Sequence, residues 1–320
     1  MIKNTLSKYR RIMSHVVLRG QDMLVNFRRA RLTFSLMFIL VGFIQASLSF
    51  AETDKNTISW AGCGITKKAF MKEISKAYEA KTGVKVQLNG GGATRGIRDA
   101  ASLKMDLGGA CRMNLPEVDR IELHATLHPV AWDALAIIVN KKNPVNSLST
   151  AQIKAIYTGK ITNWKQVGGK NARINLYVRR GTISGVGYAI RQYVFKNRNM
   201  KFKTQSKYVV KSSGPLEKAV VKDKYAMGIT GISSARKRNV KIIGFDGKVP
   251  SYENVASGKY SLYRPLYLVT SPSPTAKVKN FIKFVTSKDG RKIIRDNNTV
   301  PYRDAPALQS KMLVYGFGIL

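Results

Sequence analysis

The strongest constraint on the fold is a regular alternation of short β-type runs with amphipathic helical stretches, which begins at Thr57. Strand-like and helical patterns follow one another at 57–62, 69–83, 84–88, 96–104 and 105–110. In the helical stretches apolar residues recur every three or four positions, as on one face of a helix. Strands that alternate with helices in this way form a parallel sheet with right-handed crossovers. The sequence therefore predicts an α/β fold.

Two long apolar runs, Pro129–Asn140 and Tyr260–Thr270, bracket a second block of alternating helices and strands. This order predicts two parallel-sheet lobes joined by two crossing strands. Lobe I is expected to comprise residues 52–132 and 266–320, and lobe II to be an insert of residues 133–265. A cleft between two lobes is a common place for a ligand to bind.

The N-terminus has the pattern of a targeting segment. Three arginines precede the apolar run Leu32–Phe50, which ends in the small-x-small pattern Ser49–Ala51. This order predicts a signal peptide, residues 1–51, cleaved after Ala51, and a secreted protein that works in the periplasm. The alternative is a retained membrane anchor, because a run of this length can just span a bilayer. The basic region is unusually long, and Met23 is a second candidate for the start of translation.

The charge is strongly unbalanced. The chain carries 55 Lys and Arg against 18 Asp and Glu, a formal net charge of +37, and about +30 remains after residues 1–51 are removed. Such a charge implies an anionic partner. Export argues against nucleic acid, and aromatic residues do not alternate with the basic ones as in single-strand binders.

Composition removes several other classes of protein. The hydrophobic content of 44% excludes a disordered chain. Two cysteines and three histidines are too few for zinc modules, iron–sulfur clusters or a disulfide scaffold. No metal and no cofactor are expected.

Three turns, each between a predicted strand and a predicted helix, are candidate anion sites: Gly62–Thr66, Gly90–Gly96 and Arg179–Gly185. The start of a helix has unpaired N–H groups and the positive end of the helix dipole, and both attract anions. Named nucleotide and serine-hydrolase motifs are absent, because no P-loop, G-x-G-x-x-G with a downstream acid or G-x-S-x-G occurs. With no activated nucleophile or acid–base pair, the protein is not expected to be an enzyme.

The chain resembles the phosphate-type substrate-binding proteins of ABC importers, in the type II periplasmic-binding-protein fold. The resemblance covers about residues 57–301 and depends on these segments: AFMKEISKAYEAKTGVKVQLNGGGATRGI, DLGGACR, VAWDALAIIVNKKNPV, IYTGKITNWKQVGG, VRRGTISG, AMGITGISSA, YSLYRPLYLV and TVPY. IYTGKITNWKQVGG is the most specific of them.

The resemblance implies that an oxyanion is held at four places by backbone amides, hydroxyls and an arginine, with Arg180 as that arginine. The residues expected to bind the ligand are Gly64, Ile65, Thr66, Ala93, Thr94, Arg95, Arg112, Arg180, Ser184 and Gly185. The chain departs from the family at Val186, where a threonine is usual, at Ala93, where a serine is usual, and at Cys111, where some members have a carboxylate. The departure at Cys111 leaves the choice of oxyanion open.

Cys63 and Cys111 each follow a predicted strand of the same sheet, so both are expected to face the cleft. In an oxidising compartment two such cysteines are expected to form a disulfide. A pair of buried thiols and a redox or metal site are the alternatives.

The sequence thus predicts a monomeric binding protein that closes around one tetrahedral oxyanion, most simply phosphate, and passes it to an ABC permease of the inner membrane. The alternative is a periplasmic anion sensor or interaction protein with no role in transport.

Overall fold

The computed structural model describes residues 56–204 and 207–315. The predicted signal peptide at 1–51 and the alternative start at Met23 lie outside the described residues. Within the described ranges, no helix has the length and the apolar character needed to cross a bilayer.

The first group of elements builds lobe I. Its elements are β1 (Thr57–Gly62), α2 (Gly64–Thr66), the π-helix η1 (Lys67–Met71), α3 (Lys72–Thr82), β2 (Lys85–Asn89), α4 (Ala93–Ala101), β3 (Leu107–Ala110) and the 3-10 helix η2 (Arg120–His124). β1 pairs in parallel with both β2 and β3, as the sequence predicts. Gly83, predicted to stop α3, caps that helix with a φ of 73°.

The inserted block builds lobe II. Its elements are β5 (Ser147–Leu148), α5 (Thr150–Thr158), the 3-10 helix η3 (Trp164–Val167), β6 (Asn175–Arg179), α6 (Gly185–Phe195), β7 (Lys207–Val210), α7 (Ser213–Lys222), β8 (Ala226–Gly231), α8 (Ile232–Ala235), β9 (Lys241–Phe245) and α9 (Tyr252–Ala256). β6 lies between β7 and β8 and is parallel to both. α5 begins at a capping box of Ser149 and Gln152, which explains where it starts.

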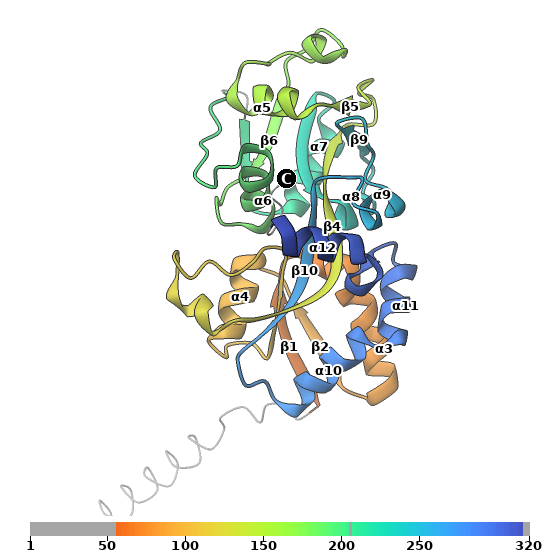
Figure 1. Ribbon diagram of the computed structural model, residues 1–320. Coiled ribbons are helices and arrows are strands. Elements are labelled where there is room, and N and C mark those ends of the chain that lie inside the picture. Colours follow the sequence, from red (N-terminus) through yellow and green to blue (C-terminus); the bar gives the residue numbers. More distant parts are fainter. Residues whose placement is uncertain (1–55, 205–206, 316–320) are drawn as a thin grey trace, which may run out of the picture. The chain divides into compact units, whose positions relative to one another are not determined.

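Two long strands join the lobes, β4 (Thr126–Val139) and β10 (Tyr263–Thr270), and both run through the middle of Figure 1. β4 pairs with β10 up to Ala134 and with β8 from Leu135, so one strand belongs to both sheets. The lobe boundary predicted at residues 132 and 133 stays a prediction, and the change of partner along β4 lies next to it. β10 runs antiparallel to β3, and β4 runs antiparallel to β8, so each sheet is parallel only in part.

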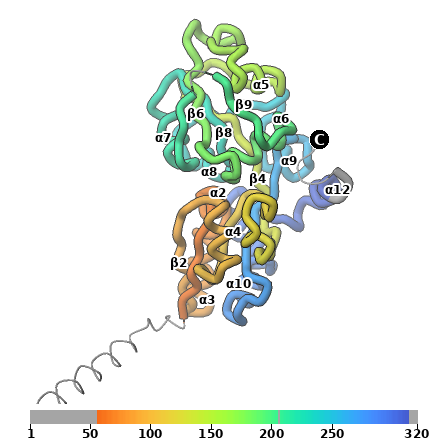
Figure 2. Tube along the Cα trace, turned by 90° about the vertical axis from the view of Figure 1, so that its left-hand side faces the viewer, coloured from red at the N-terminus to blue at the C-terminus, as the bar shows by residue number. Residues whose placement is uncertain are grey.

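The remaining elements are α10 (Ala276–Thr286), α11 (Lys288–Asp296), β11 (Val300–Pro301), the 3-10 helix η4 (Tyr302–Asp304) and α12 (Pro306–Tyr315). α10 packs on α3, where the ring of Tyr78 meets that of Phe281 edge to face at 5.0 Å. The chain thus returns to the elements of lobe I, and Figure 2 shows α10 beside α3 and the lobe II strands grouped apart from them.

Candidate functional site

A cleft of about 480 Å³ lies where the first residues of α4, α6 and α7 meet. Lobe I lines it with Cys63, Gly64, Ile65, Lys68, the turn Gly90–Ala93 and Cys111, and lobe II with Arg179, Gly185, Val186, the turn Lys211–Gly214, Ser234 and Arg238. The unpaired amides in the first turn of each helix and the positive end of its dipole favour a negative ligand. The strand-to-helix corners predicted from the sequence therefore converge on one cleft.

Glycine is required where the backbone of the cleft turns sharply. Gly91 and Gly92 have φ values of 134° and 90°, which side chains rarely tolerate. The amide of Gly92 donates to the carbonyl of Gly62 at 3.1 Å, which holds the turn against the end of β1. The turn is thereby fixed with the start of α4 facing the cleft.

Four cationic side chains line the cleft, and none of the lining residues is acidic: the cations are Lys68, Arg179, Lys211 and Arg238. Arg179 donates from Nη1 to Ser213 Oγ at 3.0 Å and from Nη2 to the carbonyl of Lys211 at 2.8 Å. Its Nε is buried and has no hydrogen-bond partner among the described residues. An unpaired buried donor on a fixed cation is a ready partner for an anion.

A buried carboxylate behind the cleft positions two of these cations. Glu217 of α7 pairs with Lys68 Nζ at 3.2 Å and with Arg238 Nε at 3.0 Å. It also accepts from Thr230 Oγ1 at 2.8 Å and from Ser234 Oγ. Because Lys68 belongs to lobe I and Glu217 to lobe II, this cluster connects the two lobes beside the cleft.

A second buried ion pair supports the floor of the cleft. Arg264 of β10 and Asp133 of β4 lie 2.9 Å apart and are both buried. Arg264 also donates to the carbonyl of Gly185 at 3.2 Å. It therefore ties the start of α6 to the two crossing strands.

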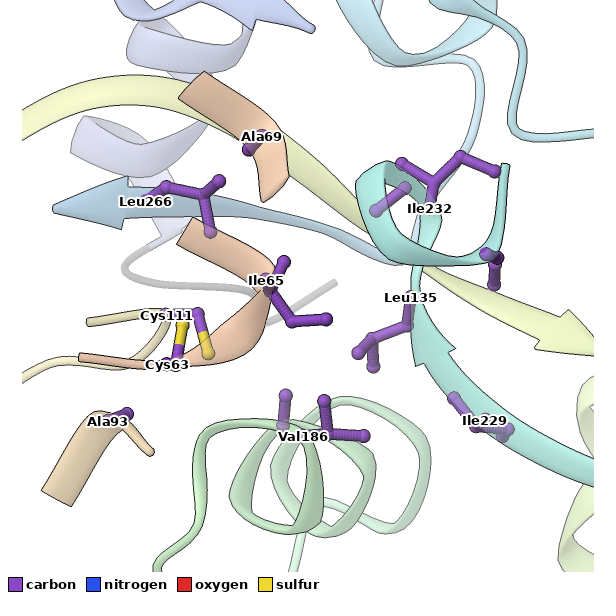
Figure 3. Close-up of a cluster of buried hydrophobic side chains, with 14 of the residues drawn as sticks. Cys63, Ile65, Ala69, Ala93, Cys111, Leu135, Val186, Ile229, Ile232 and Leu266 are labelled. Carbon is purple, nitrogen blue, oxygen red and sulfur yellow. The ribbon is translucent and has the colours of Figure 1, made fainter. Parts of the chain in front are cut away.

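The two cysteines lie on the floor of the cleft with their sulfurs side by side, as Figure 3 shows. Both are buried free thiols, so the disulfide predicted from the sequence is not formed in this structure. Burial opposes ionisation of Cys63, but hydrogen bonds from Cys111 and Thr66 outweigh it and lower the pKa of Cys63 to about 7. The same contact and burial raise the pKa of Cys111.

The predicted ligand-binding residues divide into two groups. Gly64, Ile65, Ala93 and Gly185 line the cleft, whereas Thr66, Thr94, Arg95, Arg112, Arg180 and Ser184 do not. The most important of these differences concerns the arginine. Arg180 is exposed, and the neighbouring residue Arg179 is the one that lines the cleft.

The predicted residues outside the cleft mainly have structural contacts. Arg112 pairs with buried Glu122 at 2.8 Å and donates to the carbonyl of Ile183, which also accepts from Thr94 Oγ1. Arg95 pairs with Asp99 at 2.8 Å. Ser184 Oγ caps α6 by accepting from the amide of Gly187. Thr66 Oγ1 donates to the carbonyl of Ala110.

The sequence analysis did not include Lys68, Arg179, Lys211 or Arg238, which line the cleft, among its candidate site residues. A turn that ends β6 and opens α6 was recognised, but nothing in the string Arg179-Arg180 says which arginine faces inward. Lys68 and Arg238 belong to charged segments whose pattern is typical of solvent-exposed surface. Their position depends on Glu217, which is distant in sequence from Lys68.

The positive charge is concentrated in lobe II. Residues 134–216 contain 16 Lys and Arg and no Asp or Glu. Of these basic residues, Arg198 makes an ion pair, with Glu117 of lobe I. The segment that supplies Arg179 and Lys211 is therefore almost uncompensated in charge, which attracts anions toward this side of the cleft.

Comparison with protein families gives one family match. Residues 51–289 match the family model of the PBP superfamily domain. Among curated relatives, the phosphate-binding protein PstS of Bacillus subtilis is 26% identical over 255 residues, which are 79% of this chain and 83% of the relative. PstS of Borreliella burgdorferi is 27% identical over 271 residues, 81% of this chain and 96% of the relative.

Among solved structures, two similar proteins are also named for phosphate transport. A phosphate-bound candidate substrate-binding protein of a phosphate ABC transporter from Clostridium perfringens is 29% identical, with a TM-score of 0.70, and the match covers 77% of this chain and 99% of that one. A phosphate transport receptor of the ABC type from Vibrio cholerae is 28% identical, with a TM-score of 0.60 and coverage of 76% and 99%.

Proposed function

The chain belongs to the PBP superfamily, and from its cleft and its relatives we propose that it captures inorganic phosphate and delivers it to an ABC permease. The support from the relatives is that two of them are named phosphate-binding proteins and that one solved relative holds phosphate. We further propose that it acts in the periplasm, without changing its ligand chemically.

The observation that carries this proposal is the unpaired donor of Arg179 at the meeting point of three helix starts. Its Nε has no partner among the described residues, while its two other nitrogens are held in place by Ser213 and Lys211. A tetrahedral oxyanion in the cleft would accept from Nε and from the first amides of α4, α6 and α7. Such hydrogen bonds to a charged group contribute about 1.5–3 kcal/mol each.

These contacts suffice for a physiological affinity. A dissociation constant of about 1 µM corresponds to about −8 kcal/mol. Four charge-assisted hydrogen bonds of about 3 kcal/mol each reach this value when an association cost of about 4 kcal/mol is subtracted.

Binding is expected to couple to movement of the lobes about β4 and β10. Contacts cross the cleft in this structure: Lys68 meets Glu217, and Thr94 and Arg112 both donate to the carbonyl of Ile183. A ligand held from both sides favours the closed arrangement, because its contacts to the second lobe exist only when the lobes meet.

The acid-free segment 134–216 favours a second candidate function. A surface of this charge suits an interaction protein that binds anionic envelope polymers, or a sensor that reports an anion, without transport. Phosphate uptake by cells that lack the gene separates the two candidates: transport predicts reduced uptake at low phosphate, whereas the second candidate predicts normal uptake.

The direct test of phosphate capture is isothermal titration calorimetry of the mature chain. We expect one phosphate per chain with a micromolar dissociation constant. Absence of binding at millimolar phosphate, with the protein shown to be folded by circular dichroism, would refute the proposed function.

A further inference from the structure

The cysteine pair lines the cleft but is not among the phosphate contacts proposed above. Cys63 directly follows β1 and Cys111 directly follows β3, and these neighbouring parallel strands are in register at Gly62 and Gly109. The amide of Cys63 still donates to the carbonyl of Gly109 at 3.0 Å, so the strands stay adjacent up to the cysteines. This register places Cys63 opposite Ala110, so Cys111 is its diagonal neighbour. A strand spacing of about 4.8 Å and a rise of about 3.3 Å put such Cα atoms about 6 Å apart, within the separations that disulfides bridge.

Both lobes and the cleft meet at this pair. Both cysteines line the cleft, with exposed fractions of 5% for Cys63 and 2% for Cys111. Gly185 of lobe II packs so closely on Cys111 that a Cβ there would lie 2.2 Å from Sγ. A change at these sulfurs therefore acts on the floor of the cleft and on the contact between the lobes.

We propose that Cys63 and Cys111 form a reversible oxidation site whose state sets which oxyanions the cleft accepts. This inference rests on the proposed function, because it assumes that the anion binds in this cleft.

The reaction is thiol–disulfide exchange with a low-molecular-weight or protein disulfide. The thiolate of Cys63 attacks one sulfur of the external disulfide, forms a mixed disulfide and releases one thiolate. Cys111 loses its proton, its sulfur attacks Sγ of Cys63, and the second external thiolate leaves. The pair loses two electrons and two protons, and the external disulfide gains them as two thiols.

The reduced pair places negative charge on the floor of the cleft. Hydrogen bonds from Thr66 and Cys111 hold the Cys63 thiolate, and the pKa of Cys63 is lowered to about 7 although burial opposes ionisation. Arg264 of β10, Asp133 of β4 and Arg179 of β6 interact electrostatically with the pair, and so does the titratable Tyr193 of α6. Lys68 of η1 and Arg238 after α8 line the same cleft.

A thiolate on the floor discriminates between oxyanions by their protons. Hydrogenphosphate carries a proton and donates it in a hydrogen bond to the sulfur, which offsets the repulsion between the charges. Sulfate has no proton to donate at neutral pH, so the thiolate repels it without compensation. The disulfide has no charge, and the discrimination is lost when it forms.

The size of the effect follows from the fraction of the pair that is still neutral. If sulfate binds the neutral dithiol alone, its affinity for reduced protein falls about tenfold between pH 6 and pH 8. Oxidised protein has no thiol to ionise, so its sulfate affinity stays constant over this range. At pH 8 oxidation is then expected to raise sulfate affinity about tenfold and to change phosphate affinity by less than about threefold.

The experiment titrates phosphate and sulfate into the mature protein at pH 6 and pH 8, after treatment with either dithiothreitol or oxidised glutathione and removal of the reagent. The chain has two cysteines, Cys63 and Cys111, so no other thiol can react. Intact mass after alkylation counts the thiols, with two expected in reduced and none in oxidised protein. The Cys63→Ser/Cys111→Ser variant is the control and is expected to bind sulfate equally under all four conditions.

The outcomes distinguish failure of the oxidation site from failure of the proposed phosphate binding. A sulfate affinity that depends on pH only in reduced protein supports the inference. Two free thiols after the oxidant, or equal sulfate affinities in both forms with phosphate binding intact, overturn the inference and leave the proposed function standing. Failure of phosphate to bind either form overturns the proposed function and the inference with it.

Discussion

Replacing Arg179 with alanine should weaken phosphate binding, whereas the same change at Arg180 should not. The structure places the guanidinium of Arg179 in the cleft with a free Nε, and it leaves Arg180 exposed outside the cleft. Loss of the one hydrogen bond from Nε to a charged ligand costs about 1.5–3 kcal/mol, or about tenfold to 150-fold in affinity. Loss of an exposed charge roughly 10 Å away in water costs about 0.4 kcal/mol, or about twofold, and salt reduces it further.

The assay is calorimetric titration of phosphate into wild-type protein and the two alanine variants at one salt concentration. Thermal unfolding is measured in parallel, because Arg179 also holds Ser213 and the carbonyl of Lys211. Arg179→Lys keeps the charge and removes the planar fork, so its affinity should lie between those of wild type and Arg179→Ala. Equal losses at the two positions, or a larger loss at Arg180, would refute the assignment of the anion-binding arginine.

Three further predictions follow from other parts of the molecule. Gly185→Ala should lower the free energy of unfolding in urea by about 1–3 kcal/mol, because its Cβ would lie 2.2 Å from Cys111 Sγ; an unchanged midpoint would contradict this close packing. Burial opposes ionisation of Glu122, but Arg112 outweighs it and lowers the pKa of Glu122, so its stabilising contribution should be present above pH ~4.3 and lost as the pH falls through the lower, folded-state pKa. Glu122→Gln should therefore flatten the acid limb of the plot of stability against pH, and an unchanged slope would argue against this ion pair. The association rate of phosphate should fall as NaCl rises from 0.01 M to 0.5 M, because the positive field around residues 134–216 is screened; a stopped-flow rate independent of salt would show that this field does not steer the ligand.

The sequence predicted the order of the main elements because their signals are local. The helical stretch predicted at 69–83 ends at Gly83, and Gly83 caps α3 in the left-handed conformation with a φ of 73°. The short strands β5, β7 and β9 were not predicted. β5 has two residues, too few for a periodic signal, and three of the four residues of β7 are exposed, so β7 lacks the apolar face of a buried strand.

The meeting of several helix starts at one cleft was predicted, because helix starts after parallel strands lie at one edge of a sheet. The sequence analysis assigned the ligand to Arg180, whereas Arg179 is the arginine that lines the cleft, and this difference has a physical reason. Side chains alternate along a strand, so the inward residue at its end depends on the register between β6, β7 and β8, which a single sequence does not contain. Arg112 and Thr94 were also expected to bind the ligand. In this structure Arg112 pairs with Glu122, and both residues donate to the carbonyl of Ile183, partners that only the fold brings near.

The central claim is that an oxyanion binds between the starts of α4, α6 and α7 and accepts from Arg179. The most direct test is a crystal structure of the mature protein grown with phosphate. The account predicts a single phosphate in this cleft, within hydrogen-bond distance of Arg179 Nε and of amides from both lobes. A phosphate bound elsewhere, with the cleft closed by side chains, would contradict it.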